Sequence, residues 1–434
     1  MEDNRVQLQN IVDKQNDTTA RGLINKLIWV LTMILFASFF ATNTNQYGSV
    51  ILLGITMLVL GLFVLRSRGI LRIAISAYHG FAILFALYCF VSVLWSRDGS
   101  LAVSKGVTII EILICTSVFY WYFAQELSAT ALLKAIMWGG YLVVGYTFLE
   151  FGIEGIGAIL QDASRIETDF ANINGVAMVT AMALTIAVHF WIYEGFQIST
   201  VLMIPSVVAL MASGSRTALV MAVVGVFLVI VFKIWSKHKV LALLKTGVFI
   251  IVAIAALRLI MQLPIFEGMA LRMDSLVAQF TGEGEVDSSV ERRGEFVALG
   301  WDLFSAHPIF GVGIDNARLY AEEVVGRKTY LHNNFLEMLA GGGILGFLIF
   351  YGIYGFLLVK LWRIRKKTDH IGKVMLVMLL VLLIGDYGTV SYYNKSTYFY
   401  FMFFFLYLEK QAKKENFTDG VKTDNSSSRP LYNR

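Results

Sequence analysis

The chain has 434 residues, of which 57% are hydrophobic and 15% charged, and its mean hydropathy is +0.67. Soluble domains carry about 25% charged residues, so this composition excludes an ordinary soluble enzyme and indicates an all-α polytopic membrane protein. Cys89 and Cys115 are the only cysteines and lie in apolar runs, which excludes a disulfide scaffold and a cysteine-based zinc site.

Apolar segments long enough to cross a bilayer recur along the chain. A transmembrane helix needs about 20 mostly apolar residues, and windows of that size predict about twelve, within a range of eleven to thirteen because three are short. They are too evenly apolar for the alternating strands of a membrane barrel. The predicted spans are 24–41, 48–65, 73–95, 107–123, 135–151, 175–193, 198–212, 217–234, 240–259, 334–358, 374–390 and 397–408.

The placement of basic residues predicts the orientation better than the net charge of +5 does. Lysine and arginine favour the cytoplasmic side of short loops. With the N-terminus inside, 24 of the 36 basic residues fall in cytoplasmic segments, so both termini are expected in the cytoplasm. The polar start of the chain has no cleavable signal pattern, and we expect the first span to act as its own signal.

These predictions divide the chain into five parts. A cytoplasmic tail (1–22) precedes spans one to nine (23–259), and a large extracytoplasmic loop (260–331) connects them to spans ten to twelve (332–408). The polar composition of the last part (409–434) predicts a disordered cytoplasmic tail.

The large outer loop is expected to contain an amphipathic helix. Ser288 and Glu291 form a capping box at its start, and Pro308 ends it. One face is apolar, so the helix either lies on the membrane surface or roofs a cavity. We favour a helix that covers a cavity, because Arg292 and Arg293 lie at the start of the helix and an acidic face follows them.

Three places on the predicted outer side carry charges that are costly near a membrane. The first is the turn Ser213-Gly214-Ser215-Arg216 between two spans. An arginine can snorkel from such a turn to the interface. However, the short outer turns of this chain otherwise avoid basic residues, and the guanidinium fork suits phosphate oxygens, which favours a functional role.

The second place is the pair Arg292-Arg293. A helix dipole opposes cations at its N-terminus, so the placement makes sense if an anion binds both the arginines and the helix N–H groups. A solvated charge run is an equally good explanation from the sequence alone.

The third place is the segment 330–334, Tyr-Leu-His-Asn-Asn, before the tenth span and the glycine-rich 341–346. Asn333 or Asn334 can cap the helix. His332 sits at the positive end of the helix dipole, which favours the neutral ring that can act as a base. An isolated histidine is more often a capping or interfacial residue.

Other polar residues within spans, His79, Glu111 and Asp386, are either satisfied by packing or line a cavity. Asn172 and Asn174 are expected to cap the sixth span. No nucleotide-binding loop is present, and the cytoplasmic basic residues are explained by topology, so no nucleic-acid partner is predicted.

Together these motifs resemble the O-antigen ligase / O-antigen polymerase family of bacterial membrane glycosyltransferases. The resemblance runs from about Phe170 to Gly346 and rests on the 213–216 turn, Arg293 with the following helix, the His-Pro-Ile-Phe-Gly-Val-Gly run at 307–313, and His332-Asn333 before the glycines. It implies about a dozen helices around an outer-face cavity in the bacterial cytoplasmic membrane. It also implies a glycan donor carried on polyprenyl diphosphate and a glycan acceptor, without a metal or other cofactor.

By this resemblance Arg216, Arg293 and His332 are the catalytic positions, with Arg292 leaving the register open by one residue. Ser215, Tyr330 and Asn333, beside them in the same motifs, are expected to bind substrate together with Arg292. The chemistry agrees, because a diphosphate leaving group needs cations and an attacking hydroxyl needs a base.

Three functions stay open. A polymerase that joins lipid-linked repeat units is favoured, and a ligase that moves the finished glycan to a lipid core or a protein is the alternative in the same class. A flippase for lipid-linked sugars is disfavoured, because transporters place charge near the midplane and show internal repeats. Other polysaccharide export proteins are possible partners.

Overall fold

The computed structural model describes residues 2–42, 47–126, 128–161, 173–234, 288–366 and 368–426, and scattered positions between 255 and 274. Helix accounts for 84% of the structure, and these residues include no strand, which confirms the all-α prediction. The helices of the first half are α1 (Glu2–Thr42), α2 (Gly48–Arg66), α3 (Ala77–Val91), the short 3₁₀ helix η1 (Ser92–Trp95), α4 (Gly99–Glu126), α5 (Ala129–Gln161), α6 (Ile173–Glu194), α7 (Ile198–Val201), α8 (Met203–Ala212) and α9 (Arg216–Ile234). The second half gives α12 (Ser288–Ala306), α13 (Ala317–Val325), α14 (Asn334–Ile364), α15 (His370–Asp386) and α16 (Lys395–Ser426).

Eight helices in the described ranges are long and apolar enough to cross a membrane. They correspond to eight of the twelve predicted spans, whereas 198–212 forms the shorter pair α7 and α8, and 374–390 and 397–408 fall in α15 and α16. The predicted span 240–259 lies almost wholly outside the described residues. Large apolar side chains stay exposed on the helices, as at Leu149, which is 88% exposed, and this exposure suits a lipid environment.

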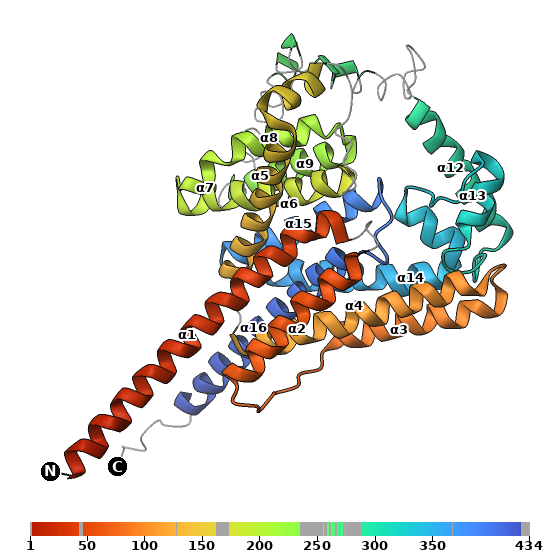
Figure 1. Cartoon of the computed structure of the whole chain (residues 1–434). Helices are drawn as coiled ribbons and strands as arrows, with labels where there is room; N and C mark the ends of the chain where they lie inside the picture. Colours follow the sequence, from red (N-terminus) through yellow and green to blue (C-terminus); the bar gives the residue numbers. More distant parts are fainter. Residues whose placement is uncertain are drawn as a thin grey trace, which may run out of the picture.

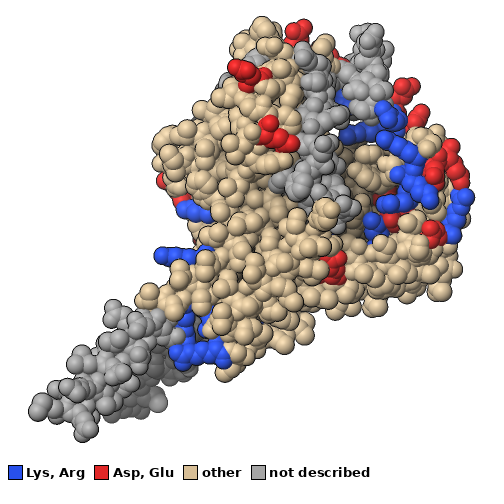
Figure 2. All heavy atoms as spheres, in the orientation of Figure 1, with Lys and Arg blue, Asp and Glu red and all other residues tan. Residues whose placement is uncertain are grey.

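The two ends of the molecule differ in charge. The start of α1 and the end of α16 lie at one end, and α12 and α13 lie at the opposite end (Figure 1). Figure 2 shows a broad uncharged surface between the basic residues near the first end and the charged residues over α12 and α13. The helices α12 and α13 therefore form a polar region beyond an apolar belt.

The described part of the large loop is an ordered unit. Helix α12 spans Ser288–Ala306 and ends before Pro308, as the proline predicts. Its apolar face packs on α13 and on the first turns of α14, and the core of this unit consists of Phe296, Leu303, Val312, Ala317, Ala321, Leu331, Leu336 and Ala340. The apolar face of α12 is therefore covered by protein.

The glycine-rich start of α14 breaks the helix at Gly343, where φ is 59° and ψ is −167°. Backbone groups freed by the break pair with the 308–313 segment. Val312 N–H donates to Ala340 O at 2.9 Å, and Ile344 N–H donates to Pro308 O at 2.9 Å. A Cβ on Gly343 would lie 2.4 Å from the Ile309 carbonyl oxygen, so the close approach requires glycine there.

The same unit is fixed to the turn between η1 and α4. Asp98 N–H donates to Asn316 Oδ1 at 2.7 Å, and Asn316 Nδ2 donates to Asp98 O at 3.1 Å. Tyr88 and Trp95 donate from their side chains to the Phe310 carbonyl. These contacts join a loop distant in sequence to the first half of the chain.

The two terminal helices extend into the predicted tails. Helix α1 starts at Glu2, within the predicted tail 1–22, and α16 runs to Ser426, within the predicted tail 409–434. A helix that is already formed extends at little cost, because only its nucleation is unfavourable.

Candidate active site

The Ser-Gly-Ser-Arg segment is a tight turn between α8 and α9. Ser213 Oγ donates to Leu210 O at 2.6 Å and accepts from Ser215 N–H at 3.1 Å. Gly214 has φ 60°, which reverses the chain. Ser215 and Arg216 are 5% and 7% exposed, and Arg216 opens α9. An exposed snorkelling arginine does not fit this burial.

The two arginines at the start of α12 differ in exposure. Arg292 is exposed and Arg293 is half-buried. Phe296 follows Arg293 by three positions, so both project from the same face of the helix. The Phe296 ring stacks on the His332 ring, with centroids 5.6 Å apart. Arg293 therefore lies on the face of α12 that approaches His332.

His332 lies on a strained turn before α14. Its φ is 54°, a conformation that costs a non-glycine residue about 1–3 kcal/mol. The ring lies beside Phe296 and beside Tyr330, whose centroid is 4.4 Å away. Leu331 is buried on one side of His332, and Asn333 is buried on the other.

The surroundings of His332 keep its ring neutral. Burial lowers the pKa of His332 to about 4, and the positive charges of Arg293, Arg327 and Arg292 act in the same direction, Arg293 most strongly of the three. Both arginines of the 292–293 pair therefore act on His332, and Arg293 has the larger effect. The neutral ring can accept a proton at physiological pH.

Two side chains hold the strained turn. Asn333 Oδ1 accepts from Phe335 N–H at 2.9 Å and from Leu336 N–H at 3.2 Å, so Asn333 caps α14. Glu337 Oε2 accepts from Leu331 N–H at 2.8 Å, on the other side of His332. Glu337 was not predicted from the sequence, although a carboxylate in the first turns of an apolar span was a signal.

Asp315 is a second buried carboxylate that the sequence analysis missed. It is 3% exposed and has φ 63°. Arg318 contacts it through two nitrogens, at 2.6 and 3.0 Å, and Lys105 Nζ lies 3.6 Å away. These paired charges connect α4 and α13 beneath the candidate site.

Asn334 ties α14 to the connection between α15 and α16. Its Oδ1 accepts from Ser391 N–H at 2.9 Å and from Tyr392 N–H at 3.0 Å, while its Nδ2 donates to Tyr351 Oη at 2.8 Å. Tyr351 in turn donates to Asp386 Oδ2 at 3.1 Å. The connection is thereby fixed next to the turn that carries His332.

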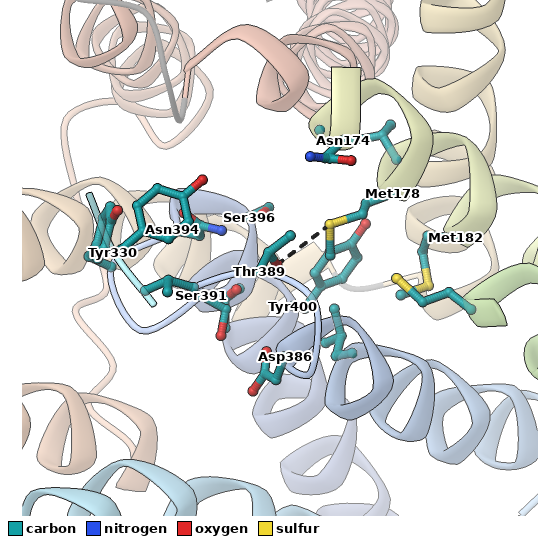
Figure 3. A pocket seen from close by; sticks show the side chains of 17 residues that line it. Asn174, Met178, Met182, Tyr330, Asp386, Thr389, Ser391, Asn394, Ser396 and Tyr400 are labelled. Carbon is teal, nitrogen blue, oxygen red and sulfur yellow. Dashed lines mark hydrogen bonds between the residues drawn. The ribbon is translucent and has the colours of Figure 1, made fainter. Parts of the chain in front are cut away.

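A cavity separates this turn from α6 and α9. Figure 3 shows Tyr330 and Asn394 on one side and Asn174, Met178 and Met182 on the other. The rest of the lining comes from Gly175 and Val179 of α6, from Met221 of α9, and from α15, α16 and their connection, namely Leu382, Asp386, Thr389, Val390, Ser391, Tyr393, Ser396, Thr397 and Tyr400. Asp386 is thus a cavity residue. Asn174 also lines it, within α6, and Asn172 lies outside the described residues.

The predicted site residues therefore fall into two groups. Tyr330, His332 and the two arginines of α12 are close together on one side of the cavity. Ser215 and Arg216 approach from α9, where the next residue, Thr217, packs against Gly388 of the α15–α16 connection. Tyr330 lines the cavity, and the α15–α16 connection supplies part of its lining.

Fold and site define a polytopic helical membrane protein with a histidine–arginine centre at its polar end. A family model described as O-antigen ligase matches residues 198–351, so this part of the chain is similar to that family. The resemblance found in the motifs is confirmed, and it indicates a membrane glycosyltransferase of the ligase or polymerase type in polysaccharide biosynthesis. Comparison with curated proteins gave no match.

Proposed function

We propose that the protein polymerises oligosaccharide repeat units carried on polyprenyl diphosphate, on the outer face of the bacterial cytoplasmic membrane. The observation that carries the proposal is the approach of Arg293 and the neutral His332 to one another at the edge of a cavity, within the region that matches the O-antigen ligase family.

In the proposed reaction a sugar hydroxyl of the acceptor attacks the anomeric carbon of the donor. The new bond joins the acceptor oxygen to that carbon, and the bond from the carbon to the diphosphate oxygen breaks. A ring nitrogen of His332 takes the hydroxyl proton. The leaving diphosphate gains negative charge, which Arg293 and Arg216 stabilise by charge-assisted hydrogen bonds.

Arg292, Ser215, Tyr330 and Asn333 are proposed to bind substrate around this centre. Asn333 has a second role as the cap of α14, and Tyr330 lines the cavity beside His332. No nucleotide is needed in this scheme, because cleavage of the sugar–diphosphate bond supplies the free energy.

Deletion of the gene tests the function. A polymerase predicts that the ladder of surface glycan collapses to one repeat unit on a gel. Accumulation of long lipid-linked chains would instead assign the ligase function, and absence of lipid-linked material outside would assign the flippase function. Purified protein should then convert lipid-linked units to longer chains.

The orientation is part of the proposal. We expect α12 outside and both termini inside, because 24 of the 36 basic residues then lie on the cytoplasmic side. Cysteines at Ser288 and Ser426, treated with an impermeant thiol reagent in intact cells, test this. Labelling at position 288 alone is expected, and labelling at 426 alone would reverse the orientation.

A further inference from the structure

The cavity beside His332 differs in chemistry from the arginine-rich face next to it. Its lining includes the acidic Asp386, and none of the lining residues is a lysine or an arginine. A diphosphate carries several negative charges and needs cationic or N–H donors. The arginines of α12 therefore suit the diphosphate, whereas the cavity suits an uncharged ligand.

The lining of the cavity combines polar groups with apolar thioethers. Amide and hydroxyl groups of Tyr330, Asn394 and Ser396 line one part, and the thioethers of Met178 and Met182 line the opposite part, beside the Asn174 amide (Figure 3). Within the described part of the chain, the side chains of Tyr330, Asn394 and Ser396 make no hydrogen bond. A sugar ring has hydroxyl groups at its rim and apolar C–H groups on its faces, so it complements both walls.

The cavity is also next to the proposed base. Tyr330 lines it, and the rings of Tyr330 and His332 have centroids only 4.4 Å apart. A hydroxyl must approach its general base to within hydrogen-bond distance. A sugar in this cavity is therefore better placed as the acceptor than as the lipid-linked end of the donor.

Both walls come largely from outside the family match. The match covers residues 198–351, whereas Met178 and Met182 of α6 precede it, and Thr389, Ser391 and Asn394 belong to the connection that follows α15. The arginines and the histidine lie inside the match. The part that the family model covers thus holds the reacting groups, and the later connection shapes the space for the ligand.

We propose that this cavity is the subsite for a neutral sugar of the acceptor, and that the α15–α16 connection selects that sugar. The proposal rests on the glycosyltransferase function proposed above. Asn394 and Ser396 bind the sugar hydroxyls, and the methionines contact its apolar face.

Cysteine protection in purified full-length protein tests the subsite. Cys89 and Cys115 are buried, so labelling of the native thiols should be slow. Asn394→Cys is treated with a maleimide in the presence of the free oligosaccharide repeat unit, released by mild acid from the donor of the producing strain, or of inorganic pyrophosphate. Tyr387→Cys is the matched control, because Tyr387 directly precedes the same connection, is 68% exposed and does not line the cavity.

The oligosaccharide should slow labelling at position 394 at least several-fold and leave position 387 unchanged, and pyrophosphate should protect neither. Protection of position 394 by pyrophosphate, or no protection by the oligosaccharide, would overturn the subsite. Ser396→Cys gives a second probe if Asn394→Cys does not fold. Wild-type protein that elongates glycan while position 394 stays unprotected would refute the subsite alone, whereas inactive wild-type protein would refute the function.

Discussion

Two histidine sites lie at opposite ends of the helical bundle, and they differ in backbone conformation and in the groups that contact the rings. At the end of α6, His189 Nε2 and His370 Nδ1 are 3.0 Å apart, and the His370 ring stacks on Tyr193. His189 lies in a regular helix and is 1% exposed. At the other end, His332 lies on a turn with φ 54°, next to a cavity residue.

The cations around the two sites also differ. Lys233 and Lys373 approach the face of Tyr193, at 4.3 and 6.0 Å, which is a stabilising cation–π arrangement. The cations near His332 are arginines, namely Arg293, Arg327 and Arg292. The comparison teaches that two histidines paired with each other mark a structural contact, whereas a strained histidine among arginines marks a site that a ligand completes.

The largest expected effect is at His332. His332→Gln keeps hydrogen bonding but cannot take a proton at neutral pH, and loss of a general base typically costs about 10²–10⁴-fold in rate. Turnover of lipid-linked donor by purified variants measures this. His189→Gln is the matched control and should retain its turnover per folded molecule. Equal turnover in the two variants would contradict a catalytic role that belongs to His332 and not to His189.

The next effect is at Arg293. Lysine offers a point charge where arginine offers a planar fork, and hydrogen bonds to charged groups contribute about 1.5–3 kcal/mol. Arg293→Lys should therefore lower kcat/KM roughly 10- to 100-fold, with normal protein levels. Arg292→Lys, at the exposed neighbour, should lose less. A larger loss at Arg292 would shift the motif register by one residue.

Substitution of Glu337 tests whether activity needs the hydrogen bond that holds the strained turn at His332. Glu337→Leu leaves Leu331 N–H without its acceptor, at a cost of about 1–3 kcal/mol, and should reduce kcat about tenfold in protein still folded at the assay temperature. Glu337→Gln keeps an acceptor oxygen and should restore kcat. Loss of melting temperature in Glu337→Leu without loss of kcat would limit Glu337 to a structural role.

The smallest effect is on the pH profile. The pKa of His332 is lowered to about 4, so the base is deprotonated above that pH and kcat/KM should fall only as the pH drops through about 4. Arg327→Gln removes one of the opposing charges, which should move this acid limb to higher pH by a fraction of a unit. If kcat/KM of the wild-type protein instead fell near the ordinary histidine pKa of about 6.5, the His332 ring would not be buried among cations.

Local pattern was enough to predict much of the molecule. Apolar runs predicted the long helices, Pro308 predicted the end of α12, and the small residues of 213–216 predicted the turn before α9. These features depend on neighbours a few residues away, through backbone propensity and side-chain burial.

Only the tertiary structure decided what the motifs do together. The glycines at 341–343 and the 308–313 segment form one backbone-paired unit, because the break at Gly343 exposes groups that need partners from elsewhere in the chain. Glu337 lies within an apolar span, and it can accept a hydrogen bond from Leu331 N–H only because the chain turns at His332. The sequence alone identified Arg216, Arg293 and His332 as candidate site residues. The stacking of Phe296 on His332, and the place of Tyr330 in a cavity wall with α6 and the α15–α16 connection, depend on contacts between segments whose distance along the chain leaves no local signal.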